Sequence, residues 1–344
     1  MPVTTTRMPA PARPTPLSMT AHGVDARTQQ DVRQLQATCQ KLIDEVGKVI
    51  VGKKDVLRMI LVNLLSQGNI LFEDFPGLAK TVMASTFARA SGCDFKRVQF
   101  TPDVLPADIT GSMVYDQKAG EFNFHPGPVF TNILLADEIN RAPPKTQSAL
   151  LEVMAERQVS IEGKTHKMEH PYIVMATQNP IEQEGTYPLP EAQMDRFLMK
   201  LTVGYPDKKD EMEIGRRRIQ RGKDDFDVSQ VCDPKTVVAM QKTCEKIHVD
   251  EAVLDYIASL VVNSRSHALV QVGSSPRGTL ALIKASRAWA ALDGRSFVTP
   301  DDVRRIAVSV LAHRLILKPD ARFGGTTATK VVEDLLAKTR APTV

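Results

Sequence analysis

The sequence has few cysteines and no long apolar run, and both absences narrow the classes of protein that it can encode. Cys39, Cys93, Cys232 and Cys244 are scattered over 344 residues, without the close pairs of a zinc site or a dithiol redox motif. We therefore expect reduced, structural thiols. The longest apolar runs, such as residues 60–65, are far shorter than the roughly 20 residues of a membrane-spanning helix. The sequence therefore predicts a soluble protein with no membrane span.

Neither sign of charge dominates the sequence. Its 44 basic and 40 acidic residues give a formal net charge of +4. A protein that binds nucleic acid usually concentrates basic residues on one face, so this balance argues against a nucleic-acid partner. Arg7 and Arg13 precede no continuous apolar segment of the kind that a secretory signal contains. We therefore expect a cytoplasmic protein.

The N-terminal segment lacks apolar periodicity and is rich in Pro, Thr and Ala. Such a segment buries too little surface to offset its ordering entropy, so residues 1–28 are predicted to be a disordered tail. An amphipathic helix is predicted from Asp31 onwards, where apolar residues recur at helical spacing.

Four short apolar runs follow, separated by stretches with helical periodicity. This alternation predicts a parallel sheet covered on both faces by helices, which is an α/β domain. The predicted strands are Asn69 to Phe72, Phe95 to Phe100, Ile133 to Ala136 and Tyr172 to Ala176. Two β-hairpins interrupt the alternation, one over residues 112–124 and one around residues 159–161 with a turn at Glu162-Gly163.

The strand patterns cease after residues 204–207, and helical patterns continue from there. We therefore place a domain boundary near Pro206. The predicted organisation is an α/β core at residues 29–206 and an all-α domain at residues 207–335.

A loop between a predicted strand and a helix has the character of a phosphate-binding loop. In that arrangement backbone amides at the helix N-terminus hold phosphate oxygens, the lysine meets the β- and γ-phosphates, and the following hydroxyl ligates Mg²⁺. Lys80 and Thr81 would take these two roles. The predicted nucleotide-binding residues of this segment are Asp74, Phe75, Pro76, Gly77, Leu78, Ala79, Lys80, Thr81 and Val82.

The loop departs from the usual G-x-x-x-x-G-K-[ST] pattern at two positions. Asp74 and Ala79 stand where that pattern has glycine. The Cβ of Ala79 penalises a positive φ, and the carboxylate of Asp74 would repel phosphate unless it points away. The loop alone leaves a nucleotide site and an ordinary turn as alternatives, and whether either residue slows hydrolysis stays open.

A pair of acids follows the third predicted strand. Asp137 and Glu138 end an apolar run, as expected where a buried strand delivers a carboxylate to a magnesium-bound phosphate. Asp137 would hold the Mg²⁺ shell, and Glu138 would orient and deprotonate the attacking water. The alternative, a solvated strand end, is disfavoured because the phosphate loop precedes it in the expected order.

Two further polar residues lie where they would complete an NTPase site. Asn179 follows the next predicted strand, beside the acidic strand end, and could position the water. Arg196 follows a proline-rich loop and, if exposed, could reach the γ-phosphate of a neighbouring subunit. For Arg196 the alternative is an ordinary surface salt bridge.

Together these motifs resemble those of MoxR-family ATPases. The segments that carry the resemblance are residues 75–78 (FPGL), 100–103 (FTPD), 135–145 (LADEINRAPPK) and 176–193 (ATQNPIEQEGTYPLPEAQ). The likeness covers roughly residues 51–315. It implies an AAA+ P-loop core, with a parallel sheet flanked by helices and a helical lid, that binds ATP and Mg²⁺.

The resemblance also implies roles for individual residues. The implied assignments are Lys80 and Thr81 as Walker A, Asp137 and Glu138 as Walker B, Asn179 as sensor 1, Arg196 as the arginine finger and Arg277 as sensor 2. Val51 and Gly52 stand where the family places adenine. Whether Arg277 would act on its own subunit's nucleotide or on a neighbour's stays open.

The same resemblance gives the hairpins and the assembly an implied meaning. Residues 105–130 would be a helix-2 insert and residues 159–167 a pre-sensor-1 hairpin, both facing a central pore or a bound client. The alternative is that they are simple decoration. The resemblance implies a homo-oligomeric ring, expected to be a hexamer, and a client with a von Willebrand factor A domain as partners.

Three functions follow from these observations. The first is a chaperone-like ATPase that matures a partner, in some cases by aiding metal or cofactor insertion. The second is a nucleotide-binding assembly scaffold with negligible hydrolysis, which Glu138 and Arg196 argue against. The third is a DNA motor, which the near-neutral charge argues against.

Overall fold

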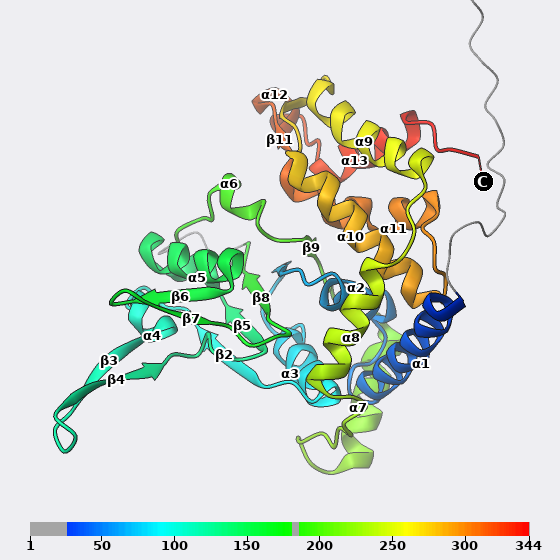
Figure 1. The fold of residues 1–344 in the computed structure, drawn as a ribbon. Coiled ribbons are helices and arrows are strands. Elements are labelled where there is room, and N and C mark those ends of the chain that lie inside the picture. The colour runs from blue at the N-terminus through cyan, green and yellow to red at the C-terminus, as the bar shows by residue number, and fades with distance from the viewer. Residues whose placement is uncertain (1–25, 181–185, 344) are drawn as a thin grey trace, which may run out of the picture.

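A parallel sheet forms the centre of the N-terminal half of the computed structural model, which describes residues 26–180 and 186–343. The described residues form a five-stranded sheet in the order β2–β5–β8–β1–β9, with every pair parallel (Figure 1). Its strands are β1 (Ile70–Glu73), β2 (Phe95–Gln99), β5 (Ile133–Asp137), β8 (Ile173–Gln178) and β9 (Met199–Leu201). The predicted α/β core is therefore confirmed. Most of the predicted tail, residues 1–25, lies outside the described residues.

Alternate residues of the central strands enter two separate apolar clusters. Ile70 and Phe72 of β1 pack in one cluster, whereas Leu71 packs in the other. Neighbouring side chains of a strand point to opposite faces, so a strand buried on both faces reads as an uninterrupted apolar run. This explains why the sequence marked these strands as continuous runs.

Helices cover both faces of the sheet. On the face of Ile70 the cluster includes residues of α1 (Ala26–Val49), α2 (Lys54–Leu65) and α3 (Lys80–Ser91), and on the face of Leu71 it includes residues of α5 (Pro144–Glu156). The first helix begins at Ala26, five residues before the predicted start at Asp31.

Two hairpins project from the core at the predicted positions. The first consists of β3 (Gly111–Asp116) and β4 (Glu121–Pro126), preceded by α4 (Pro106–Thr110), and Figure 1 shows it extending away from the sheet. The second consists of β6 (Gln158–Ile161) and β7 (Lys164–Lys167). The ring of His166 lies 4.1 Å from that of Phe124, so the hairpins contact each other near their bases.

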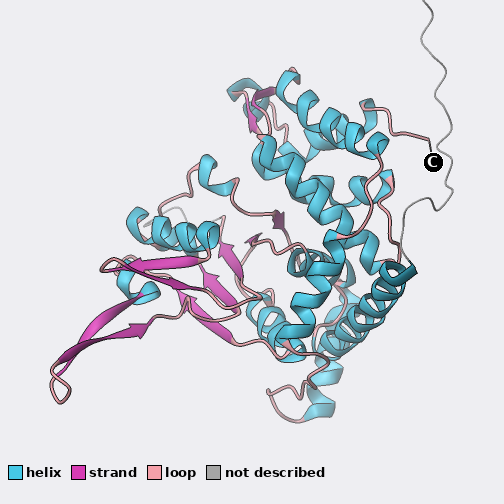
Figure 2. Cartoon of the chain, in the orientation of Figure 1, coloured by secondary structure: helices cyan, strands magenta, loops and turns pink. Residues whose placement is uncertain are grey.

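Helices dominate the C-terminal part, which lies beside the strand-rich part (Figure 2). They are α7 (Lys208–Arg221), α8 (Pro234–Glu245), α9 (Glu251–Ser266), α10 (Pro276–Leu292), α11 (Pro300–Leu311), α12 (Pro319–Phe323) and α13 (Ala328–Lys338). Residues of α8 to α11 and α13 share an apolar cluster with α1 to α3, so the proposed boundary at residue 206 separates elements with a common core.

One detail of the predicted all-α lid is wrong. Strands β10 (Val270–Val272) and β11 (Ile316–Leu317) form a small antiparallel sheet within it. Runs of three and two residues are too short for alternation to separate from helical periodicity, which is why the sequence did not mark them. Throughout the described part of the chain, no helix combines the length and apolarity needed to cross a bilayer.

Candidate nucleotide-binding site

The phosphate loop connects β1 directly to α3. Backbone dihedrals at Gly77 (φ 83°) and Ala79 (φ 55°) are left-handed, and α3 begins at Lys80. The loop borders a cavity of about 360 Å³ at the carboxyl ends of β1, β5 and β8. The lining residues are Asp74, Pro76, Gly77, Leu78, Ala79, Lys80, Thr81, Val82, Arg97, Asp137, Glu138, Thr177, Gln178 and Asn179.

Lys80 is held across this loop. Its ammonium group donates hydrogen bonds to the carbonyl oxygens of Asp74 at 2.9 Å and Phe75 at 2.8 Å, and the residue is only 9% exposed. Burial lowers the pKa of Lys80, while the carboxylates of Asp74, Asp137 and Glu138 oppose that shift. The side chain thus stands at the cavity wall as a poorly hydrated donor that a phosphate oxygen can recruit.

Asp74 does not direct its carboxylate at the phosphate position. Its Oδ2 accepts hydrogen bonds from the backbone amides of Val203 and Gly204, the latter at 2.9 Å. The adjacent Phe75 ring stacks on Tyr205 with centroids 5.8 Å apart. An aspartate at this position therefore fastens the loop to the connection between β9 and α7.

Ala79 adopts the conformation that glycine usually supplies at this position. With φ 55° and ψ 19° it is left-handed, which costs an L-residue roughly 1–2 kcal/mol relative to glycine. The loop accordingly has the geometry expected before a phosphate-binding helix, at the cost of local backbone strain.

The two acids after β5 are held by different partners. The carboxylate of Asp137 accepts a hydrogen bond from the Thr177 hydroxyl at 2.6 Å and forms an ion pair with Arg97 at 2.7 Å. Glu138 has a left-handed backbone and pairs with Arg141 at 3.0 Å. Each carboxylate that would act on Mg²⁺ or water therefore has a cationic partner in this conformation.

Sequence reasoning missed Arg97 and Thr177. Thr177 was visible as a polar residue at the end of a strand. Arg97 had a weaker signal, because a charged residue on an edge strand usually faces solvent. The register pairs Gln99 of β2 with Asp137, so Arg97, two residues earlier, lies on the same face as Gln99.

The oxygen ligands of the cavity suit a magnesium ion bound together with phosphates. Thr81 supplies a hydroxyl and Asp137 a carboxylate, both on the cavity wall. Among the described residues no group of three or more His, Cys, Asp or Glu side chains could hold a metal. Magnesium usually keeps waters and binds through one or two carboxylates plus substrate phosphates, which fits this sparse set.

Of the other predicted residues, some line the cavity and some do not. Asn179 lines it and is 8% exposed. Val51 and Gly52 are not among the lining residues. A Cβ at Gly52 would lie 2.1 Å from Asp210 of α7, and Lys53 donates to the Tyr205 carbonyl at 2.8 Å. The segment expected near adenine therefore lies against the connection that Asp74 and Phe75 also contact.

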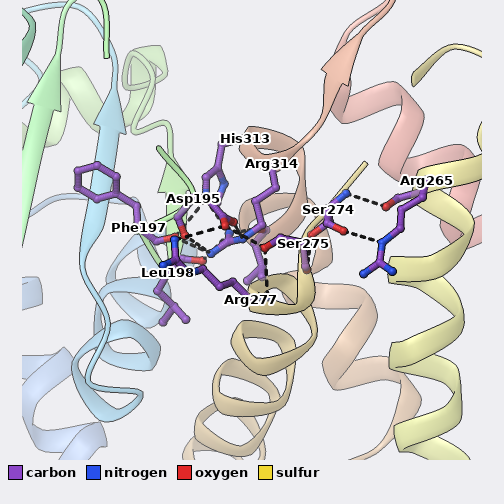
Figure 3. Close-up of polar contacts among 11 residues, drawn as sticks. Asp195, Phe197, Leu198, Arg265, Ser274, Ser275, Arg277, His313 and Arg314 are labelled. Carbon is purple, nitrogen blue, oxygen red and sulfur yellow. Dashed lines mark hydrogen bonds and ion pairs between the residues drawn. The ribbon is translucent and has the colours of Figure 1, made fainter. Parts of the chain in front are cut away.

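The two predicted arginines lie outside the cavity. Arg196 is exposed and donates to the carbonyl oxygen of Leu151 at 2.8 Å. Arg277 lies 3.7 Å from the carboxylate of Asp195, with its side chain 59% exposed (Figure 3). Neither arginine is brought to the phosphate loop of its own chain.

The backbone before Arg277 is fixed by α9. The Ser274 amide donates to the Ser264 hydroxyl at 3.0 Å, and Arg265 donates to the Ser274 carbonyl at 2.9 Å (Figure 3). A Cβ at Gly273 would lie 2.6 Å from the backbone of Arg265, so only glycine fits there. Ser275 then caps α10 by accepting from the Arg277 amide at 3.2 Å.

Comparisons with known proteins agree with this geometry. Residues 69–199 match the model of the ATPase family associated with various cellular activities (AAA), and residues 262–335 match the AAA lid domain. Uncharacterized protein YeaC of Bacillus subtilis is 43% identical, with 91% of this chain and 97% of that protein covered. Chaperone MoxR1 of Mycobacterium tuberculosis is 44% identical, with 89% and 83% covered.

A solved structure extends the likeness to three dimensions. The crystal structure of a candidate ATPase from Cytophaga hutchinsonii has a TM-score of 0.86 and 39% sequence identity, covering 92% of this chain and 98% of that one. The fold, the phosphate loop and the lid define an AAA+ protein with a nucleotide-binding core. Within that class, the chain belongs to the MoxR family of chaperone-like AAA+ ATPases.

Proposed function

We propose that this protein binds ATP with Mg²⁺, hydrolyses it, and uses the energy to remodel a partner protein. The observation that carries this proposal is that Lys80, Thr81, Asp137, Glu138 and Asn179 line one and the same cavity. They come from three separate segments, the N-terminus of α3 and the ends of β5 and β8. A cationic donor, a hydroxyl, two acids and an amide are the groups that phosphoryl transfer to water requires.

In this mechanism Lys80 exchanges its loop carbonyl partners for oxygens of the β- and γ-phosphates. Thr81 and Asp137 would hold the magnesium ion, which when bound neutralises charge on the phosphates. Glu138 leaves Arg141 and accepts a proton from the attacking water, and Asn179 orients that water. Both carboxylates must therefore change partners between the present conformation and the reacting one.

The exposed position of Arg196 supports assembly into a ring, and we propose a hexamer. Because Arg196 lies outside its own cavity, it would serve a neighbouring subunit as an arginine finger, which stabilises charge in the transition state. Arg277 would be the sensor 2 residue of the lid. An ATP-driven motor works where ATP is abundant, and we propose the cytoplasm as its compartment.

The projecting β3–β4 hairpin supports a client-binding role. Tyr115 and Phe122 are 52% and 62% exposed, and their rings pack together 5.1 Å apart. Exposed paired aromatics offer contact area to a polypeptide. A protein with a von Willebrand factor A domain is the client that we propose, its metal site or cofactor being inserted during remodelling.

Steady-state ATP hydrolysis tests the proposal when measured with magnesium on the wild type, Lys80→Ala and Glu138→Gln, together with direct nucleotide binding. We expect both variants to lose turnover and Glu138→Gln to keep binding ATP. Tight ATP binding by the wild type without turnover, alone or with client domains, would reject the motor.

A nucleotide-dependent scaffold is the second candidate. It is favoured by the ion pairs that occupy Asp137 and Glu138 and by the strained backbone at Ala79. If binding alone is the output, these pairs persist with ATP bound, and Arg196→Ala changes neither assembly nor turnover. The near-neutral charge gives a DNA motor, the third alternative, no comparable support.

A further inference from the structure

Asp195 lies at a junction between the core and the lid (Figure 3). It follows α6 (Glu191–Met194) and immediately precedes Arg196. Its carboxylate, in a side chain only 17% exposed, contacts three lid residues that lie 80 or more positions later in the sequence. The Ser275 hydroxyl donates to it at 2.9 Å, Arg314 forms an ion pair at 3.0 Å, and Arg277 lies at 3.7 Å. We call these four residues the Asp195 cluster.

Arg314 connects the lid to the backbone that follows Asp195. Its side chain is 3% exposed, and its guanidinium donates to the carbonyl oxygens of Phe197 at 2.7 Å and Leu198 at 3.2 Å. Burial lowers the pKa of Arg314 to about 10, with Asp195 opposing the shift, so it is charged at neutral pH. A buried charge of this kind needs its counterion, which fixes the segment carrying Arg196 against the lid.

The second arginine is tied to the same carboxylate. Ser275 links the two, since its hydroxyl donates to Asp195 and accepts from the Arg277 amide at the start of α10. A carboxylate at the N-terminus of this 17-residue helix is also favoured by the helix dipole. Asp195 therefore contacts the N-terminus of α10, where Arg277 lies, and is also the sequence neighbour of Arg196.

We propose that Asp195 is a positioning residue that couples the lid to the arginine finger. When nucleotide binding moves the lid, the Asp195 cluster transmits that movement to residues 195–198 and so sets where Arg196 meets the neighbouring subunit's ATP. This inference rests on the proposed function, because it needs a ring in which Arg196 acts on a neighbour.

Complementation between two impaired variants tests the coupling. Asp195→Asn keeps its own cavity intact but loosens its Arg196, whereas Glu138→Gln has a dead cavity and an intact Arg196. Neither should turn over ATP well alone, and we expect Asp195→Asn to lose about tenfold in kcat with KM for ATP nearly unchanged. In mixed rings, Glu138→Gln subunits supply a well-placed arginine finger to Asp195→Asn cavities. The turnover rate of the mixture should therefore be several-fold above the sum of the rates of the two variants measured separately.

Two controls make the outcome decisive. Arg196→Ala mixed with Glu138→Gln must complement, and if it does not, the neighbour-acting finger fails and this inference falls with it. If that pair complements but Asp195→Asn with Glu138→Gln does not, Asp195 acts within its own subunit or on folding, and the coupling is overturned. The double variant Asp195→Asn/Arg314→Gln removes both buried charges from one chain. If it keeps the wild-type melting temperature but shows the kcat loss and the complementation of Asp195→Asn, coupling is supported over misfolding.

Discussion

The cavity beside the phosphate loop and the Asp195 cluster differ in how the fold brings their residues together. The cavity gathers residues at the ends of adjacent parallel strands, where sheet geometry places polar side chains together. The Asp195 cluster joins three segments that are distant in sequence, namely residue 195 after α6, residues 275 and 277 at the start of α10, and residue 314 after α11. The cavity is thus set by the parallel sheet of the core, and the cluster by how the lid packs on the core.

This difference separates binding from hydrolysis. The residues that we propose for binding phosphate within a subunit, such as Lys80 and Thr81, all line one cavity of the core, so a single chain would have the groups for binding nucleotide. Both arginines lie outside that core's cavity, so full turnover would depend on the lid and on a second subunit. Variants in the two regions should therefore separate the affinity for ATP from the rate of turnover.

Arg196→Ala should give the largest effect. Loss of an arginine finger costs around a thousandfold in kcat. The Kd for ATP should stay within about twofold of the wild type, because Arg196 lies outside its own cavity. Arg216→Ala, which changes an exposed arginine on α7, is the matched control. An equal loss in affinity and turnover would place Arg196 in its own subunit's site.

In contrast to Arg196→Ala, Lys80→Ala should mainly weaken the binding of ATP. A hydrogen bond from a charged group contributes about 1.5–3 kcal/mol, which corresponds to roughly ten- to a hundredfold in Kd for ATP. Isothermal titration with a non-hydrolysable analogue measures this directly. Wild-type affinity in Lys80→Ala would show that the lysine keeps its contacts with the carbonyls of Asp74 and Phe75 when nucleotide is bound.

Arg97→Ala tests whether the ion pair between Arg97 and Asp137 weakens magnesium binding by Asp137. The ion pair with Asp137 involves an arginine side chain that is 48% exposed, so solvent screening limits it to about 1 kcal/mol or less. Removing it should lower the magnesium concentration for half-maximal turnover by up to about fivefold. Lys96→Ala, on the same strand and also exposed, should leave that concentration unchanged. A higher magnesium requirement in Arg97→Ala would mean that Arg97 contacts phosphate instead.

Ala79→Gly should have the smallest effect, and on stability. Glycine relieves the left-handed strain at φ 55° but gains freedom in the unfolded chain, leaving about 0.5–1 kcal/mol of added stability. Chemical denaturation measures the free energy of unfolding. Ala84→Gly, in the buried interior of the following helix α3, should lower the free energy of unfolding by about 1 kcal/mol. A destabilised Ala79→Gly would mean that the loop does not bear this strain.

Sequence alone predicted the parts of the fold and site that depend on local order. Strands such as Ile133–Asp137 were visible as buried runs ending in acids, and the phosphate loop was visible between its strand and helix. The direction of the Asp74 carboxylate was not visible, because its partners at Val203 and Gly204 lie about 130 residues away. Arg314 likewise has no local pattern that marks it as the partner of Asp195. Long-range polar contacts of this kind depend on tertiary packing, which periodicity does not encode.

The central claim is that one subunit binds ATP, whereas hydrolysis needs an arginine from a neighbour. Its most direct test is to measure turnover per subunit as a function of protein concentration. ATP binding is measured on the same samples, and assembly is followed by light scattering. We predict a constant Kd for ATP across dilution and a turnover per subunit that rises steeply as rings form. Turnover per subunit that stays the same in demonstrably monomeric samples would contradict the account, because the cavity would then be complete without a neighbour.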